Sequence, residues 1–162
     1  MRDSLPRPRY REHYWMDLAV LAALNSKDPN TQVGACLVSP DGRLFFTGWN
    51  GFPEGIEDDT ETWHNRKNDS VEISKYDLVV HAERNALDNA HRAGVYPKGW
   101  HLYCTHLPCP RCAIDSIILP GITTVFYLQK HHMGEGKTKL LLDKKHVHLV
   151  LLPDYPSAIT KA

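Results

Sequence analysis

Four residues in two short segments could bind a transition metal and move protons. His81 stands two residues before Glu83, and Cys109 stands three residues before Cys112. One imidazole and two thiolates occupy three positions of a tetrahedral zinc ion and leave a fourth for water, which is the pattern of a catalytic zinc. A carboxylate beside that water can take its proton near neutral pH. The two segments therefore predict a Zn²⁺ centre with ligands His81, Cys109 and Cys112, and with Glu83 as the catalytic proton carrier.

The spacing of His81 and Glu83 restricts where this centre can lie. In a regular helix, residues i and i+2 point about 200° apart around the axis, so they cannot share a lateral site. Both can approach one ion only if it lies off the amino-terminal end of their helix. Cys109 and Cys112 also begin a predicted helix. Two helix amino termini at one ion would favour thiolates, because each carries a partial positive charge.

The cysteines allow other interpretations. Cys109 and Cys112 could form a redox pair of the thioredoxin type. A purely structural zinc would need a fourth ligand, for which Cys104 is the candidate. Cys36 and Cys104 stand at alternating positions of predicted strands, which favours a role as buried core thiols.

The composition points to an ordinary globular domain. We expect one domain over residues 1–162, with a flexible arm over 1–9 and an insertion loop over 54–78. Nineteen basic and nineteen acidic residues give a net charge of zero, which argues against binding nucleic acid or an acidic membrane by charge alone. The polar start lacks a signal-peptide pattern, and no apolar run is long enough to span a bilayer. We therefore expect a cytoplasmic protein without structural disulfides.

Hydrophobic periodicity and turn residues predict alternating helices and strands. The helices are expected over 10–25, 81–93, 109–119 and 137–144, and the strands over 33–38, 43–48, 100–105, 123–128 and 146–152. The first two strands are close enough to form a hairpin, and the later strands are separated by helices that suit crossover connections. This order predicts an α/β fold with three layers, α/β/α, around a five-stranded mixed sheet.

The motifs together resemble those of the cytidine deaminase superfamily, and most closely those of its deoxycytidylate deaminases. The resembling segments are SKDP at 26–29, QVGA at 32–35, GWNGFP at 48–53, HAERNA at 81–86 and PCPRC at 108–112. A His-x-Glu segment followed by Pro-Cys-x-x-Cys is the signature of zinc deaminases. The resemblance implies a cytidine-deaminase-like fold and hydrolytic release of ammonia from C4 of a cytosine nucleotide. The expected reaction converts deoxycytidylate (dCMP) to deoxyuridylate (dUMP).

The resemblance also implies roles for individual residues. Glu83 would pass one proton to N3 of the base and a second to the leaving amine. Asn50 would hold the sugar, and the backbone N–H of Ala82 would contact the base. Arg92 would bind phosphate in a neighbouring subunit of a homo-oligomer, commonly a hexamer, although it could equally be an exposed helix arginine. Lys130 and the lysines of 137–139 could supply phosphate contacts or form a solvated basic face.

Two other functions use the same motifs. One is a deaminase acting on tRNA or another polynucleotide, which the zero net charge and the long insertion disfavour. The other is a non-catalytic, zinc-stabilised assembly subunit, against which Glu83 weighs because a structural zinc needs no proton carrier. The resemblance ends after Leu128, where relatives carry an aromatic residue and this chain continues with Gln129.

Overall fold

A computed structural model describes residues 11–66, 73–130, 134–152 and 155. The elements are α1 (Arg11–Ala23), β1 (Gly34–Val38), β2 (Phe45–Trp49), α2 (Thr60–His64), α3 (Lys75–Leu78), α4 (Ala82–Arg92), β3 (His101–His106), α5 (Pro110–Cys112), the π-helix η1 (Ala113–Ile118), β4 (Thr124–Gln129), α6 (Glu135–Lys144) and β5 (His148–Leu151). The predicted arm over 1–9 lies outside the described residues.

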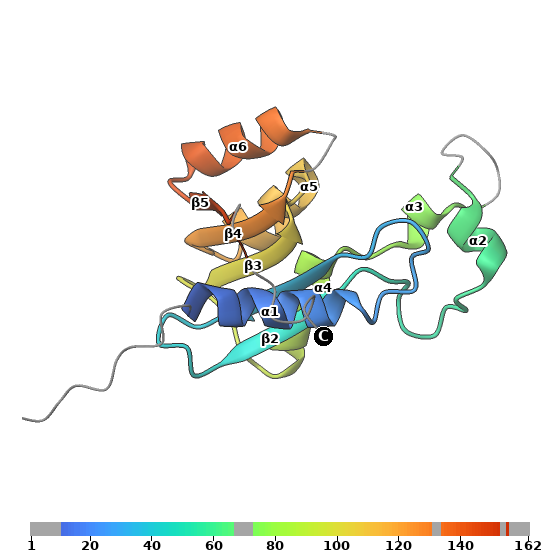
Figure 1. The fold of residues 1–162 in the computed structure, drawn as a ribbon, viewed down its shortest axis with the longest axis horizontal. Coiled ribbons are helices and arrows are strands. Elements are labelled where there is room, and N and C mark those ends of the chain that lie inside the picture. The colour runs from blue at the N-terminus through green and yellow to red at the C-terminus, as the bar shows by residue number, and fades with distance from the viewer. Residues whose placement is uncertain (1–10, 67–72, 131–133, 153–154, 156–162) are drawn as a thin grey trace, which may run out of the picture.

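The strands form one mixed sheet in the order β2-β1-β3-β4-β5 (Figure 1). β1 is antiparallel to both β2 and β3, whereas β3, β4 and β5 run parallel to one another. A short connection suffices for the antiparallel β1–β2 pair, and the parallel strands are joined through helices, as parallel pairing requires. The predicted five-stranded mixed sheet is confirmed.

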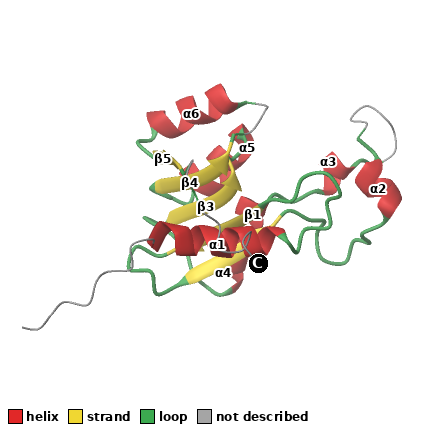
Figure 2. Ribbon diagram, viewed as in Figure 1, coloured by secondary structure: helices red, strands yellow, loops and turns green. Residues whose placement is uncertain are grey.

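Helices cover both faces of this sheet. All five residues of β1 are buried, and their side chains alternate between two apolar clusters, because successive strand residues point to opposite faces. Ala35 and Leu37 belong to the larger cluster, which includes α4, while Cys36 and Val38 belong to the smaller one, which includes α1. The helices α1 and α4 therefore lie on opposite faces, as Figure 2 shows with α1 crossing in front of the strands. This arrangement confirms the three layers.

The remaining two cysteines are part of these clusters. Cys36 and Cys104 are fully buried, on opposite faces of the sheet. Burial raises the pKa of the Cys36 thiol to about 12, so this thiol stays protonated. Both cysteines are the core thiols that their strand positions predict.

A glycine brings the start of α4 onto the sheet. A Cβ atom at Gly48 in β2 would lie 2.3 Å from the backbone nitrogen of Ala86 and 2.6 Å from the carbonyl oxygen of Ala82. Only glycine permits this approach. The contact places the amino terminus of α4 beside the end of β2, so two sequence motifs meet there.

The structure differs from the sequence prediction in two segments. The insertion predicted as a loop over 54–78 contains the short helices α2 and α3. Asp59 caps α2 by accepting the Thr62 N–H, and the Asp77 carboxylate in α3 accepts the backbone N–H and the hydroxyl of Ser74. Local capping, and not apolar periodicity, forms these helices.

The second difference follows the cysteines. The helix predicted over 109–119 is α-helical for only three residues and continues as the π-helix η1. Within the described residues, no helix is both long enough and apolar enough to cross a bilayer.

Candidate active site

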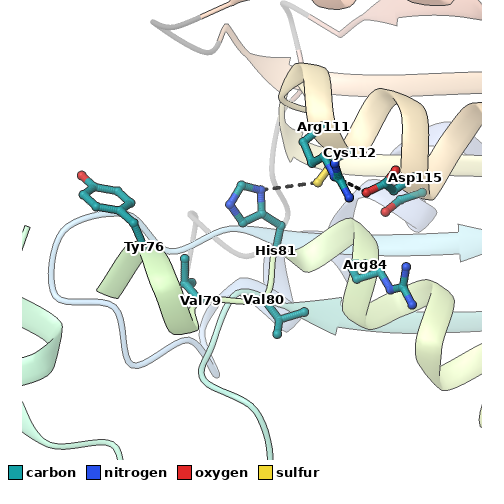
Figure 3. A pocket seen from close by; sticks show the side chains of 9 residues that line it. Tyr76, Val79, Val80, His81, Arg84, Arg111, Cys112 and Asp115 are labelled. Carbon is teal, nitrogen blue, oxygen red and sulfur yellow. Dashed lines mark hydrogen bonds and ion pairs between the residues drawn. The ribbon is translucent and has the colours of Figure 1, made fainter. Parts of the chain in front are cut away.

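Three predicted metal ligands converge at two helix amino termini. His81 is the N-cap of α4 and Cys109 is the N-cap of α5, each with extended backbone, and Cys112 ends α5. One nitrogen or sulfur atom from each of the three residues lies within 4.8 Å of the others. The His81 Nδ1 is 3.4 Å from the Cys112 sulfur and 3.6 Å from the Cys109 sulfur. Figure 3 shows the His81 ring turned toward Cys112.

The donor set has the chemistry that zinc requires. The Cys109 sulfur accepts hydrogen bonds from the thiol and the backbone N–H of Cys112, and these bonds lower the pKa of Cys109 to about 3. Hydrogen bonding to Cys109 raises the pKa of His81. The pKa of Cys112 is raised, because it donates its proton to Cys109 and is buried. A thiolate is therefore already favoured without a metal, and one imidazole with two cysteines fits a zinc ion with one open position.

Cys104 does not join these ligands. The cluster of possible ligands among the described residues contains His81, Cys109 and Cys112 only. Burial raises the pKa of Cys104 well above its usual value, so its thiol stays protonated in the core. The interpretation of a structural zinc with Cys104 as fourth ligand therefore has no support in the geometry.

Glu83 lies at the same end of α4 as His81. Its side chain is buried, with 5% exposed, and burial raises the pKa of its carboxyl. A buried carboxyl that gains a proton more readily than usual, next to metal-binding atoms, has the properties of a proton carrier.

The loop that carries Asn50 lies directly beside the metal ligands. The backbone N–H groups of Gly51 and Val80 donate to each other's carbonyl oxygens, at 3.1 and 2.9 Å. Asn50 precedes one side of this bridge and His81 follows the other. The Asn85 side chain, one turn into α4, also donates to the Trp49 carbonyl oxygen at 2.6 Å. The fold therefore brings Asn50 and His81 together across 31 residues of sequence.

Arg92 is not part of this cluster within one chain. It is the last residue of α4, about 15 Å along the helix axis from Ala82. Its exposed guanidinium lies 3.7 Å from Glu54. Of the lysines considered for phosphate contacts, Lys139 pairs with Glu135 at 2.6 Å on the surface of α6.

A cavity of about 420 Å³ opens on the outer side of His81 and Cys112 (Figure 3). Arg84 and Arg111 line it, and each forms an ion pair with the carboxylate four residues later, Arg84 with Asp88 within α4 and Arg111 of α5 with Asp115 of η1. The sequence analysis did not identify these arginines. Arg84 lies inside the HAERNA motif and Arg111 inside the PCPRC motif, and this position is the signal that could have suggested them.

The cysteine segment is held from the opposite side by α6 and β4. The Thr138 hydroxyl in α6 donates to the Pro108 carbonyl oxygen at 3.0 Å, and both residues are buried. The Leu107 N–H donates to the Gln129 carbonyl oxygen at 2.8 Å. These bonds orient the segment that delivers Cys109.

The comparisons with known proteins agree with this geometry. Residues 9–129 match the family model of the cytidine and deoxycytidylate deaminase zinc-binding region. The chain is 39% identical over 126 residues to human deoxycytidylate deaminase, covering 77% of this chain and 68% of the human protein. It is 42% identical over 149 residues to a probable deoxycytidylate deaminase of Drosophila melanogaster, covering 84% of this chain and 72% of that protein.

Solved structures give the same result. The dCMP deaminase of cyanophage S-TIM5 in complex with dCMP and dUMP superposes with a TM-score of 0.68 at 28% identity, covering 91% of this chain and all of that chain. Its apo form superposes with a TM-score of 0.71 at 26% identity, covering 90% of this chain and 99% of that one. The fold and the His/Cys/Cys cluster define a zinc-binding deaminase. The chain belongs to the cytidine and deoxycytidylate deaminase family.

Proposed function

We propose that this protein is a zinc-dependent deaminase that converts dCMP and water to dUMP and ammonia. The observation that carries the proposal is the convergence of His81, Cys109 and Cys112 at two helix amino termini with buried Glu83 beside them. The substrate is proposed from the similarity to deoxycytidylate deaminases, one of which was solved with dCMP and dUMP bound.

His81, Cys109 and Cys112 would hold the zinc ion. Bound zinc lowers the pKa of water from about 15.7 toward about 7, which supplies a nucleophile at neutral pH. Three protein ligands leave one position for that water. Because Cys109 already has a depressed pKa, little proton release opposes metal binding at this thiol at pH 7.

Glu83 would carry the protons of the reaction. Hydrolysis at C4 requires one proton of the attacking water to be delivered to N3, where it stays in the product, and the second, from the hydroxyl added at C4, to be delivered to the departing amine. One carboxylate can do both if its pKa lies nearer to neutrality than usual, and burial moves the pKa of Glu83 in that direction. Burial also excludes bulk water from the proton path.

The backbone and Asn50 would orient the nucleotide. Ala82 is the first residue of α4, so its N–H has no partner within the helix and can donate to the base. The Asn50 Oδ1 accepts one hydrogen bond, from the Val33 N–H at 2.8 Å. A carbonyl oxygen has two lone pairs, so it can also accept a sugar hydroxyl.

Arg92 would act only in an assembly. It lies about 15 Å from the start of α4, so phosphate binding by Arg92 requires a homo-oligomer in which a neighbouring subunit presents it. The hexamer, the cytoplasmic location and the single domain over 1–162 also stay predictions.

Substrate profiling tests the proposed function. Ammonia release is measured with dCMP, CMP, deoxycytidine, cytosine, dCTP and a single-stranded RNA, and the zinc content is measured on the same preparation. We expect about one zinc per chain and a kcat/KM for dCMP at least about tenfold above the other compounds. Turnover of RNA alone would favour a polynucleotide deaminase. No turnover with zinc bound would favour a non-catalytic subunit.

A further inference from the structure

A buried ion pair lies outside the metal centre. Lys75 Nζ is 2.7 Å from Asp28 Oδ2, with side chains that are 7% and 3% exposed. The two residues are separated by 47 positions in the sequence. Removing two charges from water is costly unless good geometry and further hydrogen bonds compensate. The contacts of Asp28 therefore indicate what the pair does.

Asp28 organises the loop that follows α1. Its Oδ1 accepts the backbone N–H of Asn30 at 2.9 Å and that of Thr31 at 3.3 Å. Burial on its own would raise the pKa of Asp28, but the hydrogen bonds from Lys75 and from this backbone outweigh burial and lower it. Asp28 is therefore ionised at neutral pH and can only accept hydrogen bonds.

The same carboxylate faces the amide of Asn50. Asn50 Nδ2 is 3.4 Å from Asp28 Oδ2 and donates to the Thr31 carbonyl oxygen at 2.9 Å. An asparagine side chain can turn either its oxygen or its NH2 group toward a neighbour, but an ionised carboxylate can only accept a hydrogen bond, so it pairs with the NH2 group. Together with the Thr31 carbonyl and the Val33 N–H, Asp28 holds the Asn50 amide with Oδ1 toward Val33, and the second lone pair of Oδ1 stays available.

Lys75 also connects the insertion to the site. It begins α3, which leads through Val80 to His81. Its ammonium lies 5.9 Å from the centroid of the Trp63 ring, and this ring stacks on Phe52 at 4.0 Å with an interplanar angle of 8°. Phe52 is two residues from Asn50. The projecting helices α2 and α3 in Figure 1 thus contact the loop that carries Asn50 and Phe52 through Trp63, and they contact Asp28 through Lys75.

We propose that Lys75 is a positioning residue, which acts through Asp28 to hold the Asn50 amide with its oxygen available to a sugar hydroxyl of the nucleotide. The proposal rests on the proposed function, in which Asn50 contacts the sugar. It assigns the 54–78 insertion a role in substrate affinity.

Steady-state kinetics with dCMP test this role. Lys75→Met should raise KM about tenfold, because losing one hydrogen bond to a charged group changes a binding constant by about that factor. The kcat should change less than about threefold, and zinc should be retained. Lys75→Arg keeps the charge and should recover most of the affinity. The matched control is Lys27→Met, next to Asp28, because Lys27 is 67% exposed and pairs with Asp58 at the surface. Its KM should stay within about twofold of wild type.

A double variant separates positioning from folding. Asp28→Asn with Lys75→Met removes both buried charges, so thermal stability should recover relative to Lys75→Met. A neutral asparagine at position 28 accepts hydrogen bonds from the Asn50 amide and the Thr31 backbone more weakly than a carboxylate does, so the Asn50 amide is held less firmly and KM should stay raised. If Lys75→Met does not fold, this double variant carries the comparison.

Three results would overturn the inference. The first is an unchanged KM in Lys75→Met. The second is loss of zinc from Lys75→Met, which would mean that Lys75 acts through His81. The third is recovery of both stability and KM in the double variant. If the wild-type chain does not deaminate dCMP, the proposed function fails and this inference falls with it. If the wild type is active and KM does not respond to Lys75, only this inference fails.

Discussion

The metal side and the sugar side of the site are built in different ways. The metal ligands and Glu83 sit at the starts of α4 and α5, and buried residues of α4 and η1 belong to the larger apolar cluster. Asn50 instead sits in a loop that is held by Asp28, Thr31 and Val33 from another loop, with Lys75 behind Asp28.

This difference affects how each side responds to change. Apolar packing is non-directional and tolerates substitutions that conserve volume. A buried polar network depends on every partner, because each group left unsatisfied carries its full desolvation cost. The metal side should therefore fail only when its own donors change, whereas the sugar side should respond to residues that never touch the substrate.

The largest effect is expected from a ligand. Cys109→Ser replaces a thiolate with a hydroxyl that stays protonated at neutral pH, so zinc content should fall from about one per chain to below about 0.1, with loss of deamination. Elemental analysis and ammonia release measure both. Cys36→Ala is the control, because this core thiol belongs to the smaller apolar cluster and not to the ligand cluster, so the variant should keep its zinc. Full zinc in Cys109→Ser would contradict the ligand assignment.

A variant of Glu83 distinguishes proton transfer from metal binding on the metal side of the site. Glu83→Gln removes the proton carrier but keeps the volume, so kcat should fall about 10³-fold while zinc content and KM change little. Glu57→Gln, at an exposed position in the insertion, should keep wild-type kcat. Activity of Glu83→Gln within about tenfold of wild type would mean that another group moves the proton.

Asp28 tests the sugar side through pH. The pKa of Asp28 is lower in the folded protein than its ordinary value of 3.8, so the ionised pair stabilises the fold above that value. The contribution is lost as pH falls through the depressed pKa. In denaturant titrations of metal-free protein, Asp28→Asn should be about 3 kcal/mol less stable than wild type at pH 7, and the difference should shrink below about pH 4.

The control for this measurement is another ion pair. Asp88 pairs with Arg84 on the exposed face of α4, so Asp88→Asn should cost less than about 0.5 kcal/mol at either pH. A difference between Asp28→Asn and wild type that does not change with pH would show that the Asp28 charge is not the stabilising feature.

The smallest effect is expected where a polar bond supports the metal side. Thr138→Val keeps the volume but leaves the Pro108 carbonyl oxygen without this donor, which should cost about 1 kcal/mol of stability. Zinc affinity, measured by competition with a chelator, should fall less than about tenfold. Thr138→Ser keeps the hydroxyl and should restore the zinc affinity. A fall in zinc affinity of more than about tenfold would show that the metal side also depends on a polar partner.

Much of the fold and the metal side could be predicted from the sequence. The alternation of apolar residues indicates the five strands and the main helices, because side-chain periodicity is a local property. The i,i+2 spacing of His81 and Glu83 restricts an ion that both approach to the amino terminus of their helix, and the i,i+3 spacing of Cys109 and Cys112 lets both sulfurs reach one ion. The helices α2 and α3 escaped prediction because they are stabilised by caps within a segment that lacks apolar periodicity.

The sugar side could not be predicted in the same way, because its contacts join distant residues. The sequence by itself determined the donors of the metal centre, because the two residues of each pair are only two or three positions apart, so local helix geometry limits where their side chains can meet. Only the tertiary structure decided that Lys75 is buried against Asp28, since an isolated lysine in a polar segment reads as exposed. The meeting of residues 28, 50 and 75 depends on how β2, α3 and the loop after α1 pack, and no local pattern records that arrangement.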